Sequence, residues 1–353
     1  MCYRFYLMRP IPESIRQRLG DEKTQKRLQI QEKLKQRQVS QGLGLFAMER
    51  FFSVNACVGG IISLCGMKKR GLSNILDLRI EQHEVILPGL PASFEGFRIM
   101  QLADLHCDLD AGMITRIREV IVTIPHDAVM LTGDYHNKVS RPFDLSIEEM
   151  LRLIPHLHPL RFAVLGNHDF LEKVPPLENA GLPFLLNESA AIEREGSRIW
   201  ICGIDDPHFF LTHDLAQARS GVPANEISIL LSHSPETYRE AATLGYDLQL
   251  SGHTHGGQIC APGGFPIYRN APGCRREHLS GSWREGKMIG YTSRGTGSAG
   301  VPARFHCPPE ITIHTLRSSP LNGRQMHADA STPFYLTKGN PRNDALPGSG
   351  SGG

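Results

Sequence analysis

The sequence has no paired-cysteine motif, no long apolar run and no large net charge. Its eight cysteines are scattered, without a C-x-x-C pair, along 353 residues, a length that does not need disulfides for stability. We therefore expect reduced thiols and a cytoplasmic protein. Lys and Arg exceed Asp and Glu by only two charges, so no nucleic-acid partner is expected.

The most apolar stretch, residues 51–67, is too short for a transmembrane helix, which needs about 20 apolar residues. It is also interrupted by Ser53, Asn55 and a glycine pair. A signal peptide would lie nearer the N-terminus, behind basic residues. Two interpretations stay open. One is a helix packed on the domain; the other is a peripheral helix at the inner membrane face, using residues 51–70 with the KKR triplet facing anionic head groups.

Four segments differ in composition. Residues 1–50 are polar and basic, which predicts a partly helical N-terminal extension with an exposed, solvated face. Residues 51–93 are expected to form the apolar helix and a connecting segment, and residues 94–317 the main domain. Residues 318–353 are rich in Pro, Gly and Ser, so a disordered tail is expected.

Short β-rich runs alternate with amphipathic stretches from Phe97 onward, which predicts an α/β fold. The expected strands are Phe97–Ala103, Ala128–Thr132, Phe162–Leu165, Ile199–Ile204, Ile227–Ser232, Leu248–Ser251, Met288–Thr292 and Ile311–Leu316. The expected helices include Asp110–Val122, Ser146–Ile154 and Pro235–Leu244. Functional residues of such sheets lie beyond the carboxyl ends of the strands.

Five of the predicted strands end in Asp, His or Asn side chains. The segments that follow them are DLH (104–106), GD (133–134), GNHD (166–169), His233 and GHTHGG (252–257). Strand alternation is expected to place both members of D-x-H, and both of H-x-H, on one side of the sheet. A polar turn, a helix N-cap or a satisfied polar pair would explain any one segment. It would not explain all five in succession.

Such a cluster suits a binuclear metal site. Two divalent ions about 3.5–4 Å apart lower the pKa of a shared water and bind phosphate oxygens, which promotes phosphoester hydrolysis. The pair of ions needs an anionic bridge, for which Asp134 is the candidate. Mixed oxygen and nitrogen donors favour Mn, Fe, Zn or Ni over Ca or Mg, and among these we expect manganese. Cys107 follows His106, but alternation should point it away from the ions.

The motifs DLH, GDYHN, GNHD, LSHSP and SGHTHGGQ together resemble those of the calcineurin-like metallophosphoesterase superfamily. The flanks LPGLPASFEGFRIMQLADLH and SRGTGSAGVPARFHCPPEITIHTL are similar to its bacterial YkuE/YaeI-type phosphoesterase branch. The resemblance covers residues 70–317. It implies a hydrolase of phosphoester bonds, built as a four-layer α/β/β/α sandwich with two metal ions at one edge of its two sheets.

The resemblance also implies a role for each site residue. The first ion would be bound by Asp104, His106, Asp134 and His255. Asp134 would bridge to the second ion, whose other ligands would be Asn167, His233 and His253. His168 would face the leaving-group oxygen, either as a general acid or as a positive charge on the phosphate.

One position departs from the pattern of the family. The run after the bridging residue usually ends in a second Asp, which orients the catalytic His, whereas here it ends in Asn137. An Asn side chain could accept a hydrogen bond from His168 but would not stabilise the protonated imidazole. We therefore expect a lower pKa for His168 than in relatives with Asp. Asp169 is the alternative partner, although as the next residue it should point elsewhere.

Three residues outside the metal set are candidates for substrate contact. Arg294 precedes a G-x-G-x-x-G segment at 295–300 that is followed by prolines, not by a helix. A glycine-rich loop with a phosphate contact from Arg294 is therefore expected in place of a dinucleotide site. Asp206 and His208 follow another predicted strand, where a capped turn and a substrate contact both remain open.

These observations predict hydrolysis of a phosphodiester, pyrophosphate or phosphomonoester by a hydroxide that bridges two metal ions. Related enzymes include a UDP-2,3-diacylglucosamine diphosphatase of lipid A synthesis, and the apolar segment with its basic flank suits such a lipid-linked substrate. This is the favoured specific function. A protein phosphatase is a weaker alternative, because long substrate-groove insertions are missing. A non-catalytic metal-binding scaffold of the same fold is the other, but such a protein should have lost several ligands.

Overall fold

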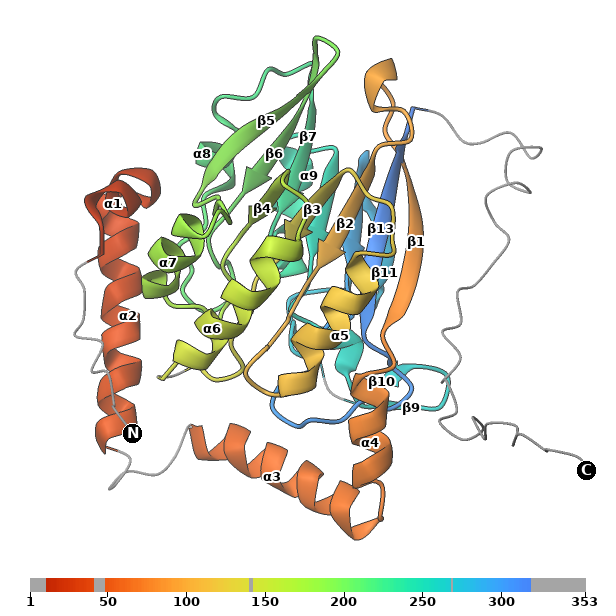
Figure 1. Cartoon of the computed structure of the whole chain (residues 1–353). Coiled ribbons are helices and arrows are strands. Elements are labelled where there is room, and N and C mark those ends of the chain that lie inside the picture. Colours follow the sequence, from red (N-terminus) through yellow and green to blue (C-terminus); the bar gives the residue numbers. More distant parts are fainter. Residues whose placement is uncertain (1–10, 41–47, 140–141, 268, 319–353) are drawn as a thin grey trace, which may run out of the picture. The chain divides into compact units, whose positions relative to one another are not determined.

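Two β-sheets form the centre of the fold in the computed structural model (Figure 1). The structure describes residues 11–40, 48–139, 142–267 and 269–318, which belong to one compact unit, Met1–Ser319. The tail expected to be disordered lies outside the described residues from position 319 onward, as do the first ten residues of the N-terminal extension.

The first sheet has five strands in the order β1-β13-β2-β3-β4. Their bounds are Arg79–Ile86 (β1), Arg98–Leu102 (β2), Ala128–Leu131 (β3), Arg161–Ala163 (β4) and Glu310–Arg317 (β13). Strands β2, β3 and β4 are parallel to one another, so their carboxyl ends meet at one edge. Strand β13 is antiparallel to β2 and parallel to β1.

The second sheet has six strands in the order β11-β12-β8-β7-β6-β5. Their bounds are Glu188–Arg194 (β5), Ser197–Gly203 (β6), Ile227–Leu231 (β7), Leu248–Ser251 (β8), Gly281–Glu285 (β11) and Met288–Thr292 (β12). Strands β6, β7, β8 and β12 are parallel. A separate short hairpin pairs β9 (Cys260–Ala261) with β10 (Phe265–Pro266).

Helices cover the outer face of each sheet, so the expected four-layer α/β/β/α sandwich is present (Figure 1). The first sheet packs on α5 (Ala111–Ile121), α6 (Asp144–Leu153) and α7 (Val174–Asn179), and the second on α8 (Leu215–Arg219) and α9 (Tyr238–Thr243). Short 3₁₀ turns lie at Ala92–Phe94, Ile154–His156, Leu171–Lys173, Pro235–Thr237, His255–Gly257 and Arg276–Leu279. A third apolar core, which includes Ile99, Met130, Ile229 and Leu250, fills the space between the sheets.

The N-terminal segment is helical and has an exposed face, as expected, but its opposite face is buried, which was not predicted. Helix α1 spans Glu13–Leu19 and α2 spans Asp21–Ser40. The face of α2 that carries Thr24, Arg27 and Gln31 is buried. These polar residues lie three and four positions apart, on one side of the helix. They are buried because charged and backbone partners on the main domain meet them, which a hydrophobic pattern does not reveal.

The apolar segment forms α3 (Met48–Leu64), followed by α4 (Lys68–Ile75). Ile62 packs against Ala303 and Phe305 of the main domain, whereas Leu64 is 90% exposed. The segment before residue 94 is more than a connection, because it contains the edge strand β1. Among the residues that the structure describes, no helix is both long and apolar enough to cross a membrane.

Candidate active site

The predicted metal ligands lie just beyond the strands, in turns of left-handed backbone. Asp104, His106, Asp134, His253 and His255 all have φ between 38° and 70°. This conformation is costly for residues with a Cβ and concentrates at functional sites. Turn geometry therefore sets the direction of these side chains, and the strand alternation that we expected to do so ends earlier, at Leu102 and Ser251.

One group of donor atoms gathers around His106. Its Nε2 atom lies 3.1 Å from Nε2 of His255 and 3.8 Å from Oδ2 of Asp134. Nε2 of His255 lies 3.6 Å from Oδ1 of Asp104. These spacings suit atoms that share one central cation, and the trio of Asp104, His106 and His255 has ligand atoms within 4.8 Å of one another.

A second group gathers around Asn167. Its Oδ1 atom lies 2.9 Å from Nε2 of His233 and 2.9 Å from Nδ1 of His253. Nε2 of His233 is 3.3 Å from Oδ2 of Asp134, so Asp134 adjoins both groups. The structure thus brings all seven predicted side chains together but separates His253 from His255. His255 lies in the first group and His253 in the second.

The hydrogen bonds behind the cluster fit a metal site. His106 donates its Nδ1 proton to the carbonyl of His136, and His233 donates its own to the carbonyl of Thr132, both at 2.8 Å. In its neutral form each ring therefore has its lone pair on Nε2, the atom that faces Asp134. Metal-binding histidines are commonly fixed in this way. Together with carboxylate and amide oxygens, these imidazoles form a donor set suited to divalent transition metals.

The ionisation of the cluster favours added positive charge. Burial lowers the pKa of His106 to about 4 and holds those of His253 and His255 well below the ordinary value. Burial also acts on His233, but Asp134 overcomes it and raises the His233 pKa to about 10. A buried aspartate that attracts a proton to its neighbour in this way would equally attract a divalent cation, which then displaces that proton.

Asp169 holds the loops that carry the ligands. Its carboxylate accepts hydrogen bonds from the backbone N–H groups of Gly166 (3.0 Å), Asp134 (2.8 Å) and Tyr135 (3.1 Å). It also pairs with Lys173 at 2.8 Å, and both side chains are fully buried. Asp169 therefore fixes the bridging residue in place, and it is not placed as a hydrogen-bond partner of the His168 ring.

His168 lies at the open side of the cluster, with Nε2 3.9 Å from Oδ2 of Asp134. Burial lowers its pKa, and the opposing influence of Asp134 is smaller. Among the described residues the His168 ring makes no hydrogen bond to the Asn137 side chain, whose Oδ1 accepts the N–H of Gly300 at 2.8 Å, although a hydrogen bond to the Asn137 backbone raises the His168 pKa. Asn137 therefore anchors the glycine-rich loop, a role that could not be recognised before the loop was placed.

Two of the three candidate substrate contacts are already engaged elsewhere. The guanidinium of Arg294 pairs with Glu310 and Glu81, so it is not free for a phosphate. The carboxylate of Asp206 accepts backbone N–H groups of residues 208, 209 and 210, which makes it the cap of a turn. Of the two interpretations left open for Asp206, a capped turn and a substrate contact, the structure therefore shows the capped turn.

His208, the third candidate, does adjoin the site. Its ring centroid lies 4.2 Å from that of His253. On the other side, Nδ1 is 2.6 Å from Oε2 of Glu236. Burial opposes protonation of His208, but the ion pair with Glu236 raises its pKa. A protonated imidazole beside the second group of donors could bind a phosphate oxygen.

Sequence reasoning missed two residues that support the ligands from behind. Arg304 is fully buried, and its guanidinium contacts Nδ1 of His255 (3.3 Å) together with carbonyls of the glycine-rich loop, including Gly295 (3.2 Å). Asp108 pairs with His136 (3.1 Å), whose carbonyl orients His106. The only sequence signal for Arg304 was its place in the segment PARFHC, which belongs to the flank similar to the family.

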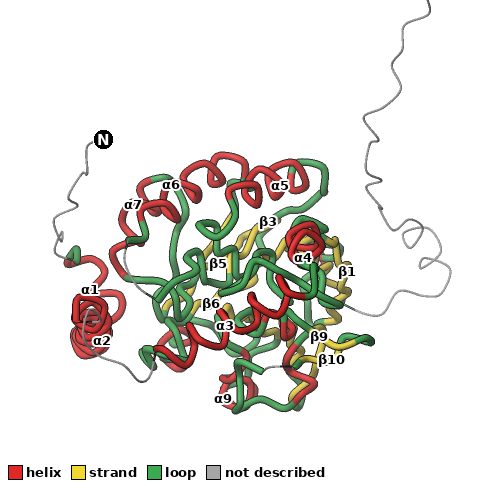
Figure 2. Tube along the Cα trace, turned by 90° about the horizontal axis from the view of Figure 1, so that it is seen from below, coloured by secondary structure: helices red, strands yellow, loops and turns green. Residues whose placement is uncertain are grey.

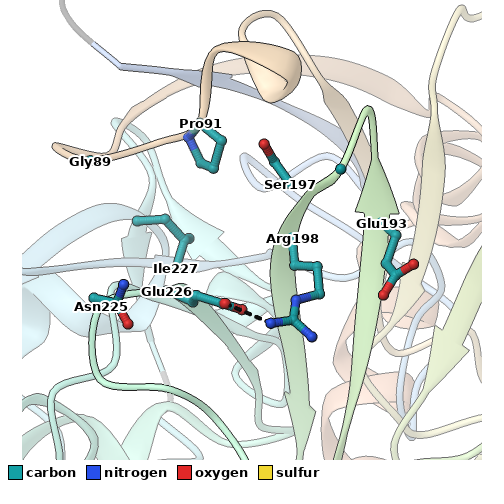
Figure 3. Close-up of a pocket in the computed structure, with 9 residues that line it drawn as sticks. Gly89, Pro91, Glu193, Ser197, Arg198, Asn225, Glu226 and Ile227 are labelled. Atoms are coloured by element: carbon teal, nitrogen blue, oxygen red, sulfur yellow. Dashed lines mark hydrogen bonds and ion pairs between the residues drawn. The ribbon is translucent and has the colours of Figure 1, made fainter.

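Cys107 is not aimed at the cluster, as predicted. Its thiol donates to the carbonyl of Tyr135 at 3.0 Å. A separate pocket lies at the opposite ends of the strands, where β6 and β7 begin (Figure 3). Arg198 and Glu226 pair across it at 2.9 Å. No predicted ligand lines this pocket, so we do not connect it with the chemistry.

Comparison with known proteins agrees with this geometry. The model of the calcineurin-like phosphoesterase family matches residues 97–257. The Bacillus subtilis protein described as uncharacterized metallophosphoesterase YkuE is 31% identical over 252 residues, which cover 67% of this chain and 85% of YkuE. The chain belongs to the calcineurin-like phosphoesterase family.

Two further relatives extend the comparison. Phosphodiesterase YaeI of Escherichia coli is 29% identical over 62% of this chain and 81% of YaeI. A Danio rerio protein described as a transmembrane protein with metallophosphoesterase domain is 28% identical over 67% of this chain and 56% of its own length. As a metallophosphoesterase of this family, the chain is a hydrolase of phosphoester bonds.

Proposed function

We propose that this enzyme hydrolyses a phosphodiester or pyrophosphate with two divalent metal ions. The observation that carries the proposal is the convergence of seven donor side chains into two groups that share Asp134. Bound there, two ions would activate a water molecule and neutralise phosphate charge. Asp104, His106 and His255 serve the first ion, and Asn167, His233 and His253 the second. Manganese is the metal that we propose.

Two imidazoles would handle the substrate. His168 is placed to protonate or stabilise the leaving-group oxygen, because it borders Asp134 from the open side of the cluster. His208, kept protonated by Glu236, would bind a phosphate oxygen beside His253. The two residues lie on loops from different sheets, so a phosphate between them would meet one group from each sheet.

For the substrate class, we propose a lipid-linked phosphodiester or pyrophosphate of the UDP-2,3-diacylglucosamine type, used at the inner face of a cytoplasmic membrane. Helix α3 exposes Ile61 (59%) and Leu64 (90%) one turn before the KKR triplet. Phe265 and Ile267 are also exposed, by 54% and 72%. Apolar side chains beside basic ones favour a membrane surface. A relative described as a transmembrane protein is in keeping with this proposal.

These exposed residues belong to one region of the structure. Helices α3 and α4 lie below the sheets in Figure 1 and face the viewer in Figure 2. The β9–β10 hairpin is linked to the same region, because Ile259 bridges to Phe305, which also packs on α3. The segment 295–307 joins this region to the active-site edge, since Arg304 contacts His255.

A metal-resolved activity screen tests the proposed function. The purified chain would be assayed with each divalent metal on an aryl phosphomonoester, an aryl phosphodiester, a pyrophosphate and UDP-2,3-diacylglucosamine in vesicles. We expect diester or pyrophosphate turnover with two ions bound per chain. Asp134→Asn should lower kcat by more than about 100-fold. This loss is larger than the loss of activity typical of removing a residue that only supports a metal ligand.

The controls separate the alternatives. Turnover of soluble diester without any lipid-linked turnover would reject the substrate class but keep the reaction. A phosphatase would prefer phosphorylated peptides and the monoester. A scaffold would bind metal and turn over nothing, and its behaviour would be the same with Asp134→Asn.

A further inference from the structure

The guanidinium of Arg27 lies buried between two loops of the main domain. Its Nη1 atom pairs with Oδ1 of Asp205 at 2.6 Å, and Nη2 donates to the carbonyl of Asp169 at 2.7 Å. Its Cζ atom sits 3.9 Å from the ring centroid of Phe210. Arg27 and Asp205 are both 0% exposed. The Arg27 side chain thus contacts a carboxylate, a backbone carbonyl and an aromatic ring at the same time.

The two loops come from different sheets, and each carries an imidazole of the active site. Asp169 follows His168 in the loop after β4. Asp205 lies three residues before His208 in the loop after β6. Asp205 also accepts the hydroxyl of Thr212 at 2.5 Å, which closes its loop. A shift of the guanidinium would therefore displace both loops.

We propose that Arg27 is a positioning residue of the active site, which sets the separation of His168 and His208 across the bound phosphate. The N-terminal helix α2 lies outside the segment that matches the family, residues 97–257, yet by this inference it is a part of the catalytic apparatus. The inference rests on the proposed function, in which these two imidazoles contact the substrate.

The contacts that α2 makes near the surface have a simpler purpose. Lys23 pairs with Asp214 (2.9 Å) and Lys26 donates to the carbonyl of Leu211 (2.7 Å), both near the surface. Such contacts hold a helix in place at little desolvation cost. Burying a guanidinium is far more costly unless its geometry is well satisfied. Arg27 spans both loops, which the exposed contacts do not.

The planar guanidinium matters as much as its charge. It can donate hydrogen bonds to Asp205 and to the Asp169 carbonyl in two directions at the same time. A lysine ammonium is a compact charge on a flexible stem and lacks this fixed geometry. Arg27→Lys therefore keeps the charge and loses the geometry. Asp205→Asn keeps the shape and one acceptor oxygen but removes the partner charge.

The test compares Arg27→Lys, Arg27→Met and Asp205→Asn with the control Lys26→Ala. Two aryl phosphodiesters that differ only in a nitro group on the leaving phenol serve as substrates. Because His168 assists the leaving group, the poorer phenol depends on it more. We expect kcat to fall by about 100-fold on the phenyl substrate and about 10-fold on the nitrophenyl one. The KM and the metal content of the variants should stay near the wild-type values. The melting temperature of the control Lys26→Ala should also stay near that of wild type.

Equal losses on both substrates, or unchanged kcat per folded and metal-loaded molecule, would overturn the proposal. If Arg27→Met does not fold, Arg27→Lys and Asp205→Asn must still show the unequal losses. Failure of this inference is distinct from failure of the proposed function. In the first case wild type turns over both diesters while the variants show no leaving-group effect; in the second, wild type turns over neither.

Discussion

At the scale of single residues, Gly166 makes a close contact with the residue at the centre of the site. A Cβ added there would collide with Oδ1 of Asp134 and lie 2.7 Å from its backbone nitrogen. Asp134 is the residue shared by both donor groups, so it cannot move without disturbing both. The glycine in GNHD is thus required by the close approach of the Asp134 carboxylate.

We predict that Gly166→Ala lowers kcat on an aryl phosphodiester by about 100-fold, because a shift of about 1 Å in a reacting geometry has effects of this size. Metal titration should show weaker binding of at least one ion. Gly221→Ala is the matched control, because nothing lies within 4 Å of its added Cβ. Full activity in Gly166→Ala would mean that Asp134 is not the bridge.

Asp169 and Lys173 give a second prediction at this scale. Asp169→Asn leaves the fully buried Lys173 ammonium without its anionic partner. We expect the free energy of unfolding, measured with urea, to fall by about 3 kcal/mol. Adding Lys173→Met should recover part of that loss, because the unpaired charge is then gone. If the double variant is no more stable than Asp169→Asn, the ion pair is not the cause.

The close grouping of the seven candidate ligands could be predicted from the sequence, and the residues that support them could not. Motifs such as GNHD and GHTHGG are local, and they follow strands that apolar runs reveal. The contact of Asn137 with Gly300 joins residues 163 positions apart, and that of Arg304 with His255 spans 49 positions. No local pattern encodes such pairs, so neither the contact of Asn137 with Gly300 nor the ion pairs of Arg294 with Glu81 and Glu310 could be predicted.

At the scale of elements, the strands that the sequence predicted are central apart from the short edge strand β4, and the three longest ones that it missed are at sheet edges. Strands β1, β5 and β11 end their sheets, and most of their residues are only half-buried or exposed. An edge strand with one solvated side lacks the apolar run that identifies a central one. Helix α2 escaped recognition as a buried element for the related reason that its inner face is polar.

Helix α3 carries the prediction for this scale. Replacing Ile61 and Leu64 by Glu should abolish sedimentation with anionic vesicles, because it removes exposed apolar area and adds repulsion from the head groups. Turnover of a soluble diester should stay within about twofold of wild type, because both side chains point away from the domain core. Glu substitution of the exposed Leu145 on α6 is the matched control. Binding that survives the double substitution would exclude α3 as the contact.

At the scale of the whole molecule, a chain of hydrogen bonds joins the two sheets away from the metal cluster. Ser282 of the second sheet lies 3.1 Å from Nε2 of His83, whose Nδ1 lies 2.9 Å from Nδ1 of His314. Nε2 of His314 is 2.9 Å from Oε1 of Gln101. Gln101 in turn donates to the carbonyl of Ser251, at the end of β8 (2.9 Å).

This chain is complete only when His314 is neutral. Gln101 Oε1 is an acceptor, so His314 carries its proton on Nε2 and accepts on Nδ1, and His83 must donate from Nδ1. A proton added to Nδ1 of His314 would set two N–H groups against each other, whereas one added to Nε2 of His83 would face the Ser282 hydroxyl, which can accept it. Burial accordingly lowers the pKa of His83 to about 4 and that of His314 well below the ordinary value.

We predict that the protein becomes less stable as the pH falls below neutral, because the histidines that join the two sheets become protonated more readily in the unfolded chain. An unfolded histidine takes up a proton near pH 6.5, whereas folded His83 does so only near pH 4. Between these values the unfolded chain binds more protons, so the free energy of unfolding must fall as pH falls from 6.5 towards 4. Urea titrations of the chelator-treated protein at several pH values would measure this slope without a contribution from metal release. His314→Gln removes one titrating group of the pair, so its free energy of unfolding should depend less steeply on pH. A slope equal to that of wild type would assign the acid sensitivity to the histidines of the metal cluster instead.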